Sequence, residues 1–193
     1  LSVWGEVYIN DAFGNSHRAD ASMLAVAKIL PAFAGSGLIK EVNELTRFLE
    51  NTPRPFVAIL GGAKIETKVP LIKRLLPMAD AILVAGALAN TILKSRGLEV
   101  GESLVEGNYL EEARKIDSPK IVLPIDVKCA DTFANDANTL TVDYTAIPKD
   151  MMGLDIGPKS IALFNDLLSN SKTIIWNGPL GAFEMPNFAD GTN

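Results

Sequence analysis

Two lysines beside a pair of glycines are the residues whose types and spacing most directly suggest chemistry. The glycines follow an apolar run at 55–60, and Lys64 and Lys68 come four residues apart at the start of a segment with helical spacing. Cations at a helix N-terminus are disfavoured unless backbone N–H groups and ammonium groups together bind an anion there. The pattern therefore predicts a phosphate site that includes Gly62, Ala63, Lys64 and Lys68; the alternative is two solvated surface lysines.

A second apolar run ends in a loop with similar features. The run 173–176 is typical of a buried strand, and the Asn-Gly-Pro sequence that follows forces the chain out of the sheet. In parallel sheets, ligands bind outside the carboxyl ends of the strands. Gly178 and Gly181 leave room for a flat ring, and Glu184 offers two acceptor oxygens for the hydroxyls of a ribose. The alternative is a tight surface turn with a solvated glutamate.

Other kinds of site are excluded or disfavoured. The chain contains no G-x-x-x-x-G-K-[ST] loop, and it lacks the G-x-G-x-x-G pattern that a nicotinamide dehydrogenase would carry. One histidine and one cysteine cannot build a zinc site, a Cys/His nucleophile pair or a disulfide. We expect no metal ligands in this chain and interpret Cys129 as a small packing residue.

Composition narrows the possible partners. Of 193 residues, 48% are hydrophobic and the net charge is −5, so there is no electrostatic basis for binding nucleic acid. The longest weakly polar run, 81–93, is too short to span a membrane, and no secretory signal is visible. These features predict a soluble cytoplasmic protein. The chain starts at a leucine and stops at a polar segment, which suggests an internal piece of something larger.

Buried strands alternate with helices along most of the chain. The predicted strands are 7–10, 56–60, 81–85, 121–125, 140–142 and 173–176. The predicted helices are 21–30, 38–50, 66–76, 87–96, 109–116 and 160–168. The alternation indicates an α/β fold with a doubly wound, mostly parallel sheet and flanking helices. A domain boundary is expected inside or just before the helix at 38–50.

Five segments in this order resemble the phosphoglycerate kinase family: 8–18 (YINDAFGNSHR), 60–68 (LGGAKIETK), 123–126 (LPID), 152–158 (MGLDIGP) and 176–184 (WNGPLGAFE). The family has two α/β domains hinged by a helix. The resemblance makes residues 1–37 the tail of the N-terminal substrate domain and 38–50 the interdomain helix. Residues 51–193 would be the nucleotide-binding domain, incomplete at its C-terminus.

The resemblance implies reversible phosphoryl transfer between 1,3-bisphosphoglycerate and ADP, giving 3-phosphoglycerate and ATP in glycolysis or gluconeogenesis. Mg²⁺ would arrive with ATP or ADP, and its protein ligand would lie outside this segment. The enzyme would be a monomer when full length. The segment alone is expected to be inactive, because the substrate arginines of the N-terminal domain and a late Gly-Gly-Gly-Asp loop are missing.

The resemblance also implies roles for single residues. Arg18, with His17 beside it, would bind the carboxylate or phosphate of the glycerate, because a guanidinium pairs with two oxygens at once. Lys68 would be the catalytic cation on the nucleotide phosphates and the transferring group, and Lys64 would support the same charge. Phosphoryl transfer depends on such positioning and charge stabilisation more than on covalent chemistry.

The remaining implied residues surround the nucleotide. Gly153 and Leu154 would line the adenine slot, Gly86 would lie near the base, Asn177 would face the phosphates, and Glu184 would take the ribose hydroxyls.

Four residues depart from the family pattern. Ala85 and Ala87 replace frequent glycines and would add methyl groups near the base. Met151 replaces a frequent tryptophan, and Asp20 stands where histidine is frequent, close enough to Arg18 to dampen its charge. None of these removes a group with an assigned role. The alternative to an enzyme segment is a non-catalytic adenine-nucleotide-binding module that kept Lys68 and Glu184.

Overall fold

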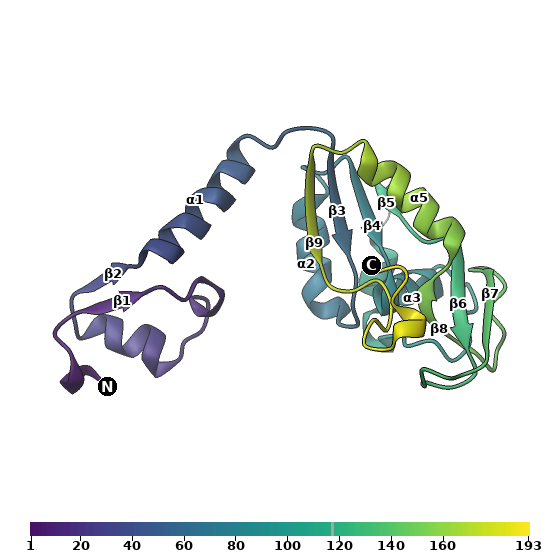
Figure 1. Ribbon diagram of the computed structural model, residues 1–193, viewed down its shortest axis with the longest axis horizontal. Helices are drawn as coiled ribbons and strands as arrows, with labels where there is room; N and C mark the ends of the chain where they lie inside the picture. The colour runs from purple at the N-terminus through teal and green to yellow at the C-terminus, as the bar shows by residue number, and fades with distance from the viewer. Residues whose placement is uncertain (117) are drawn as a thin grey trace. The chain divides into compact units, whose positions relative to one another are not determined.

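The computed structural model describes residues 1–116 and 118–193, which form two compact units, Leu1–Thr52 and Pro53–Asn193. Figure 1 shows the elements of both units along the chain. Each unit has its own hydrogen-bonded sheet structure.

The first unit contains a two-stranded parallel sheet and one long helix. Strands β1 (Tyr8–Asn10) and β2 (Ala32–Ala34) pair in parallel, and helix α1 (Ser36–Glu50) follows β2 directly. The carboxylate of Asp11, just beyond β1, accepts the Leu38 N–H at 2.8 Å. An acceptor at this position satisfies one of the free N–H groups of the first helical turn. Asp11 therefore fixes the start of α1. This helix is the one predicted at 38–50, and it begins two residues earlier than predicted.

The predicted helix at 21–30 is irregular. A π-helical turn at Ala21–Ala25 leads into a 3₁₀ turn at Val26–Lys28, after the short 3₁₀ turns Ser2–Trp4 and Phe13–Asn15. Of residues 1–52, all of them described, only Gly35 is buried. Most helical stability in proteins comes from packing one face against a core, and packing imposes no regular period here. Strand β2 was missed because it lies within a segment rich in proline and glycine, a composition typical of a linker.

The second unit is built on a four-stranded parallel sheet. Its strand order is β5 (Ile121–Val122), β4 (Ala81–Val84), β3 (Phe56–Leu60) and β9 (Thr173–Asn177). All three pairings are parallel, and β3 lies in the middle with every residue buried. Because parallel strands in one sheet point the same way, the loops after β3, β4 and β9 leave the sheet at one edge.

Helices flank this sheet, as Figure 1 shows. They are α2 (Ile65–Leu75), α3 (Gly86–Ser95) and α5 (Pro158–Ser169), with a short α4 (Leu110–Arg114) after a 3₁₀ turn at Gly107–Tyr109. Val57 and Ile59 of β3 share a core cluster with Phe164 of α5. The alternate residues of β3 are equally buried, so both faces of the sheet are covered. The predicted doubly wound, mostly parallel α/β class is confirmed.

A three-stranded antiparallel sheet completes the second unit. Its order is β7 (Thr139–Asp143), β6 (Asp126–Ala130) and β8 (Met152–Ile156). Only β7 was predicted. β6 and β8 were missed because each contains an aspartate, and β8 also a glycine, residues that are depleted in strands. The predicted strand 121–125 is correspondingly too long: β5 ends at Val122, just before Leu123-Pro124, where proline lacks an N–H for the ladder.

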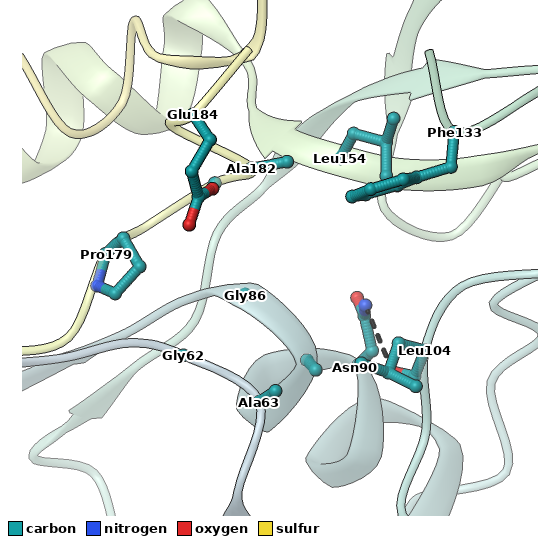
Figure 2. A pocket seen from close by; sticks show the side chains of 13 residues that line it. Gly62, Ala63, Gly86, Asn90, Leu104, Phe133, Leu154, Pro179, Ala182 and Glu184 are labelled. Carbon is teal, nitrogen blue, oxygen red and sulfur yellow. Dashed lines mark hydrogen bonds between the residues drawn. The ribbon is translucent and has the colours of Figure 1, made fainter.

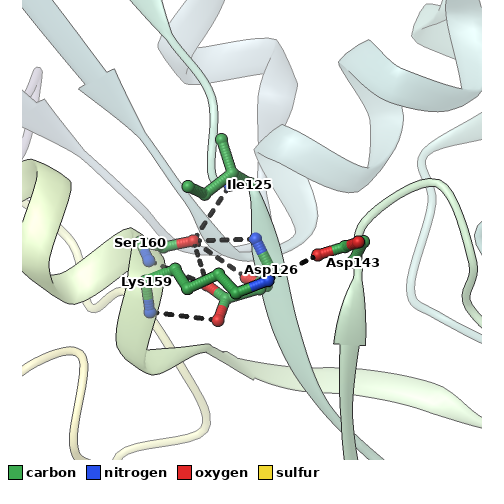
Figure 3. A network of polar contacts seen from close by, with 5 residues as sticks. All are labelled: Ile125, Asp126, Asp143, Lys159 and Ser160. Carbon is green, nitrogen blue, oxygen red and sulfur yellow. Dashed lines mark hydrogen bonds and ion pairs between the residues drawn. The ribbon is translucent and has the colours of Figure 1, made fainter.

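One buried polar cluster joins the antiparallel sheet to helix α5 (Figure 3). The Asp126 carboxylate accepts the backbone N–H groups of Lys159 at 3.0 Å and Ser160 at 2.8 Å, and the Ser160 hydroxyl at 2.6 Å. The Ser160 Oγ in turn accepts the N–H groups of Ile125 at 2.9 Å and Asp126 at 3.0 Å. A negative charge at a helix N-terminus is also favoured by the helix dipole. Asp126 thus caps α5 from the first residue of β6.

We predict that Ser160→Ala lowers the free energy of unfolding by about 1–3 kcal/mol, because it leaves the N–H groups of Ile125 and Asp126 without their acceptor and removes one donor to the Asp126 carboxylate. Urea unfolding of the 193-residue chain measures the change. Lys159→Ala is the matched control, since it removes only the exposed Lys159–Asp143 ion pair (3.1 Å) and should cost about 0–1 kcal/mol. Equal losses in the two variants would contradict this account of the junction.

Candidate functional site

The loops that follow β3 and β9 touch backbone to backbone. The Gly61 N–H donates to the Asn177 carbonyl at 3.0 Å. A Cβ on Gly61 would lie 1.9 Å from the Pro179 carbonyl oxygen, and one on Gly178 would lie 2.5 Å from the Gly61 oxygen. Gly178 also has φ +90°, a conformation that only glycine adopts readily. Glycine is therefore required on both sides of this crossing.

The N-terminus of α3 joins the same crossing. Gly86 has φ +65°, and a Cβ there would lie 3.2 Å from the Gly62 nitrogen. The Leu88 N–H reaches the Gly62 carbonyl at 3.3 Å. Three loops, after β3, β4 and β9, are thus held together at the carboxyl edge of the parallel sheet.

A pocket of about 220 Å³ lies where these loops face the antiparallel sheet. Figure 2 shows Glu184 directing its carboxylate into the pocket beside Pro179, with Leu154 and Phe133 on another side. The pocket is lined by Gly62, Ala63, Gly86, Ala87, Asn90, Leu104, Phe133, Gly153, Leu154, Pro179, Gly181, Ala182 and Glu184. Six of the residues predicted to bind nucleotide are in this set: Gly62, Ala63, Gly86, Gly153, Leu154 and Glu184.

The expected reason for a glycine was wrong at position 178. Gly178 does not line the pocket, and its missing side chain makes room for the Gly61 loop. Gly181 does line the pocket, but a Cβ there would lie 2.3 Å from a carboxylate oxygen of Asp155. Both glycines therefore serve contacts within the protein.

Lys68 and Asn177 meet beside the pocket. The Lys68 ammonium donates to the Asn177 side-chain oxygen and lies 3.5 Å from the Asn177 carbonyl. Partial burial lowers the pKa of Lys68, because desolvation disfavours the charged form. Two of the predicted phosphate-site residues, far apart in sequence, thus come together at the end of β9. Lys64 lies at the N-cap of α2 and is exposed.

The N-terminus of α2 already bonds to an anionic side chain. The Glu106 carboxylate, from the segment after α3, accepts the Ile65 N–H at 2.5 Å. The charge argument for a phosphate at this helix end remains, but one helix N–H group has a protein partner that the sequence pattern did not reveal. Glu106 lies 41 residues from Ile65, and such a long-range bond has no local sequence signal.

Several pocket residues were missed by sequence reasoning. Asn90 is buried on α3, where its amide donates to the Leu104 carbonyl at 3.4 Å and its oxygen accepts the Tyr144 hydroxyl at 3.1 Å. Phe133 follows β6 and is 69% exposed although it lines the pocket. The available sequence signal was a phenylalanine within the mostly polar segment 131–138, where an aromatic side chain has no obvious core to join.

The departures from the family pattern fall in different places. Ala87 lines the pocket, whereas Ala85 is buried in the core cluster beneath α5. Met151 packs beside a second cluster that contains Cys129, whose burial raises its thiol pKa to about 11. The interpretation of Cys129 as a packing residue is confirmed.

In the first unit, His17 and Arg18 are exposed after the 3₁₀ turn at Phe13–Asn15. The Arg18 Nε lies 3.7 Å from a carboxylate oxygen of Asp20. The expected closeness of Asp20 to the arginine is thus present, as an exposed ion pair of small energetic weight.

Asp155, on β8 next to Leu154, is a buried carboxylate beneath the Glu184 loop. It is 3% exposed and accepts the Gly191 N–H at 3.0 Å and the Ile156 N–H at 2.9 Å. Burial raises its pKa to about 6, with Asp190 adding to the rise, while the two N–H groups and Lys128 oppose it. The carboxylate therefore holds the loop that carries Glu184 at some cost in desolvation.

Two further features bear on function. Among residues 1–116 and 118–193, no group of three or more His, Cys, Asp or Glu side chains is placed to hold a metal ion. Within the same part of the chain, none of the helices combines the length and the apolar character that a membrane span requires.

The open parallel sheet, with a glycine-rich pocket at the carboxyl ends of its strands, places the chain among the doubly wound α/β proteins, a class in which ligands bind at this edge. The sequence pattern of one family, phosphoglycerate kinase, matches residues 1–193. A phosphoglycerate kinase of Rubrobacter xylanophilus is 49% identical over 190 residues, which cover 97% of this chain and 48% of the relative. One of Lactobacillus acidophilus is 46% identical, with the same coverage of 97% and 48%.

Solved structures agree. Phosphoglycerate kinase of Coxiella burnetii superposes with a TM-score of 0.87 at 37% identity, over 99% of this chain and 51% of that one. The enzyme of Pyrococcus horikoshii gives a TM-score of 0.86 at 27% identity, over 100% and 50%. The chain belongs to the phosphoglycerate kinase family, and it spans about half the length of the curated relatives it matches.

The raised pKa of Asp155 predicts a pH dependence of stability. In the unfolded chain this carboxyl titrates near 3.8, and in the folded chain near 6. Between these values the folded state binds more protons, so the contribution of Asp155 to the free energy of unfolding is greatest below about pH 3.8 and is lost as the pH rises through about 6. We expect the stability difference between the wild type and Asp155→Ala to shrink from pH 4 to pH 7 in urea unfolding. A difference that grows over this range would contradict the raised pKa.

Proposed function

We propose that this chain is the nucleotide-side segment of a phosphoglycerate kinase, which transfers a phosphoryl group between 1,3-bisphosphoglycerate and ADP. The observation that carries the proposal is the convergence of six expected nucleotide residues on one pocket of a family member, with Lys68 and Asn177 beside it. The proposal assigns residues 1–37 to the tail of the substrate domain, 38–50 to the interdomain helix, and 51–193 to the nucleotide domain. We also propose, from the family alone, that the full-length enzyme is monomeric and cytoplasmic.

The pocket fits a nucleoside. Gly153 and Leu154 of β8 offer a strand edge and an apolar side chain to a flat base. The small residues of the loops after β3 and β4 line the pocket with them. The Glu184 carboxylate, directed into the pocket, accepts hydrogen bonds from two ribose hydroxyls. Adenine nucleotides supply both groups, and their phosphates then extend towards the glycine loop and Lys68.

The phosphate end uses charge and position. An oxygen of the ADP β-phosphate forms a bond to the acyl-phosphate phosphorus, and the bond from that phosphorus to the carboxyl oxygen breaks, which leaves a free carboxylate and ATP. Lys68 neutralises the oxygens on which negative charge spreads, after exchanging its bond to Asn177 for one to phosphate. Lys64, at the exposed N-cap of α2, adds a second positive charge.

The proposed reaction also requires binding of the glycerate substrate and of a metal ion. Arg18, with His17, binds the carboxylate or phosphate of 3-phosphoglycerate. Mg²⁺ supplies further charge neutralisation on the nucleotide phosphates when it is bound. Among the described residues, no group of three or more His, Cys, Asp or Glu side chains is placed to hold this ion.

A non-catalytic adenine-nucleotide-binding module is the second candidate. The chain covers only about half of its relatives, and the pocket alone requires no glycerate. Turnover by a polypeptide of the relatives' full length separates the two functions, because both predict nucleotide binding but only the enzyme transfers phosphate.

We predict that the 193-residue chain binds ADP weakly and shows no kinase turnover. The pocket retains its base and ribose groups, whereas the chain covers about half of each relative. Isothermal titration calorimetry with millimolar ADP measures binding, and an ATP-coupled assay measures turnover. A folded chain that releases no heat with ADP would count against the pocket as the nucleotide site.

In a polypeptide of the relatives' full length, Lys68→Ala should lower kcat by about 10²–10³, because a preorganised cation acts most strongly in the transition state. Lys68→Arg should also lower kcat, since a planar guanidinium cannot replace the compact ammonium that contacts the Asn177 side chain. Lys64→Ala, at an exposed position, should cost less. Steady-state kinetics at saturating substrates decide this, and wild-type kcat in Lys68→Ala would return both lysines to the role of surface residues.

A further inference from the structure

The segment that follows Glu184 is fastened to the antiparallel sheet by one lysine of β6. Lys128 Nζ donates to the Asn187 carbonyl at 2.5 Å and lies 3.5 Å from a carboxylate oxygen of Asp190. The same ammonium lies 5.7 Å from the ring centroid of Phe188, within the range of a cation–π interaction. Three residues of one short segment therefore share a single cation.

Glu184 lies in a short bridge between two attachment points. Before it, the Ala182 N–H donates to the Leu154 carbonyl of β8 at 2.8 Å. After it, Asn187 is only three residues away. Between these points the chain makes two successive turns, from Met185 N–H to Ala182 and from Phe188 N–H to Met185, at 2.9 and 2.8 Å. Because so few residues separate the two attachment points, the position of Asn187 limits the positions that Glu184 can take.

The environment of Lys128 makes this attachment stronger than an ordinary surface contact. Its side chain is 24% exposed, against 66% for Asp190, and the ring beneath the ammonium belongs to the fully buried Phe188. Hydrogen bonds to a charged donor are stronger than neutral ones, and partial desolvation reduces screening. Asn135 also bonds Asn187 twice, at 3.0 and 2.5 Å, but through neutral groups on an exposed loop.

We propose that Lys128 is a positioning residue for nucleotide binding: it holds the Asn187–Asp190 segment so that the Glu184 carboxylate is presented to the ribose. Lys128 does not line the pocket and acts through the segment. The inference rests on the proposed function, since it assigns Glu184 to the ribose hydroxyls. A purely structural lysine would stabilise the chain without affecting recognition of those hydroxyls.

The test is a double-mutant cycle in ADP affinity, measured by calorimetry on the 193-residue chain. Glu184→Ala should weaken ADP binding about 10-fold and leave 2′,3′-dideoxy-ADP almost unchanged. Lys128→Met, which keeps the apolar stem, should weaken ADP binding about 5-fold through lost coupling to Glu184 and should likewise spare the dideoxy nucleotide. The double variant should bind ADP no more weakly than Glu184→Ala alone.

Control variants separate positioning from loss of folding. Lys128→Arg keeps a charged donor and should restore most of the preference for ADP over dideoxy-ADP. Lys159→Met removes an exposed ion pair with Asp143 and should change neither affinity. If Lys128→Met unfolds, Lys128→Gln, which can still donate to the Asn187 carbonyl but carries no charge, takes its place and should show the same selective loss.

The outcomes distinguish the two levels of the proposal. If Glu184→Ala leaves ADP affinity unchanged, the ribose assignment itself fails. If Glu184→Ala weakens binding but Lys128→Met reduces affinity for ADP and dideoxy-ADP equally, or adds fully to Glu184→Ala, then the site stands and the positioning role of Lys128 is overturned.

Discussion

The close crossing of the loops after β3 and β9 is the contact on which the rest of the site depends. At Gly61 and Gly178 no side chain fits, because each Cβ would lie within 2.5 Å of a backbone atom of the other loop. Direct backbone contact lets the carboxyl ends of two neighbouring parallel strands converge, with Gly86 as the third member. Side chains carried by these loops, Lys68 through its helix and Glu184 through its loop, are placed relative to one another by that convergence.

Two buried carboxylates attach the other half of the pocket. Asp126 binds the N-terminus of α5, and Asp155 binds the loop beyond Glu184 through the Gly191 N–H. Each lies where a glycine, Gly157 or Gly181, leaves room for a carboxylate. Burying a charge is unfavourable unless hydrogen bonds compensate it, and here backbone N–H groups provide them. The antiparallel sheet is therefore fixed to α5 and to the loop beyond Glu184 by two carboxylates whose partners are mostly main-chain N–H groups.

The sequence was informative where local patterns decide the structure. The strands β3, β4 and β9 and the helices α1, α2 and α5 were predicted to within about two residues, because apolar runs and helical periodicity are visible in the sequence. The expectation that the last strand is buried was wrong: β9 is the edge strand of its sheet, and Ile174 and Trp176 are about half exposed. Strands β6 and β8 were not, because Asp126 and Asp155 oppose strand propensity and are stabilised only by tertiary hydrogen bonds. Phe133 and Asn90 escaped notice for a related reason, since the first follows an unrecognised strand and the second reads as an ordinary polar residue of a helix.

The polar groups beside the pocket show how a phosphate would be accommodated. Lys68 bonds to Asn177, and the first N–H of α2 bonds to Glu106, so both groups have partners within the protein. A phosphate that enters exchanges these partners for its own oxygens, and the gain is the difference between two hydrogen bonds rather than the whole of one. The Glu106 carboxylate adds repulsion that a neutral ligand would not meet. Under the proposed function, affinity for the phosphates would thereby be moderated in the ground state, while Lys68 would still respond to the larger negative charge that develops during transfer.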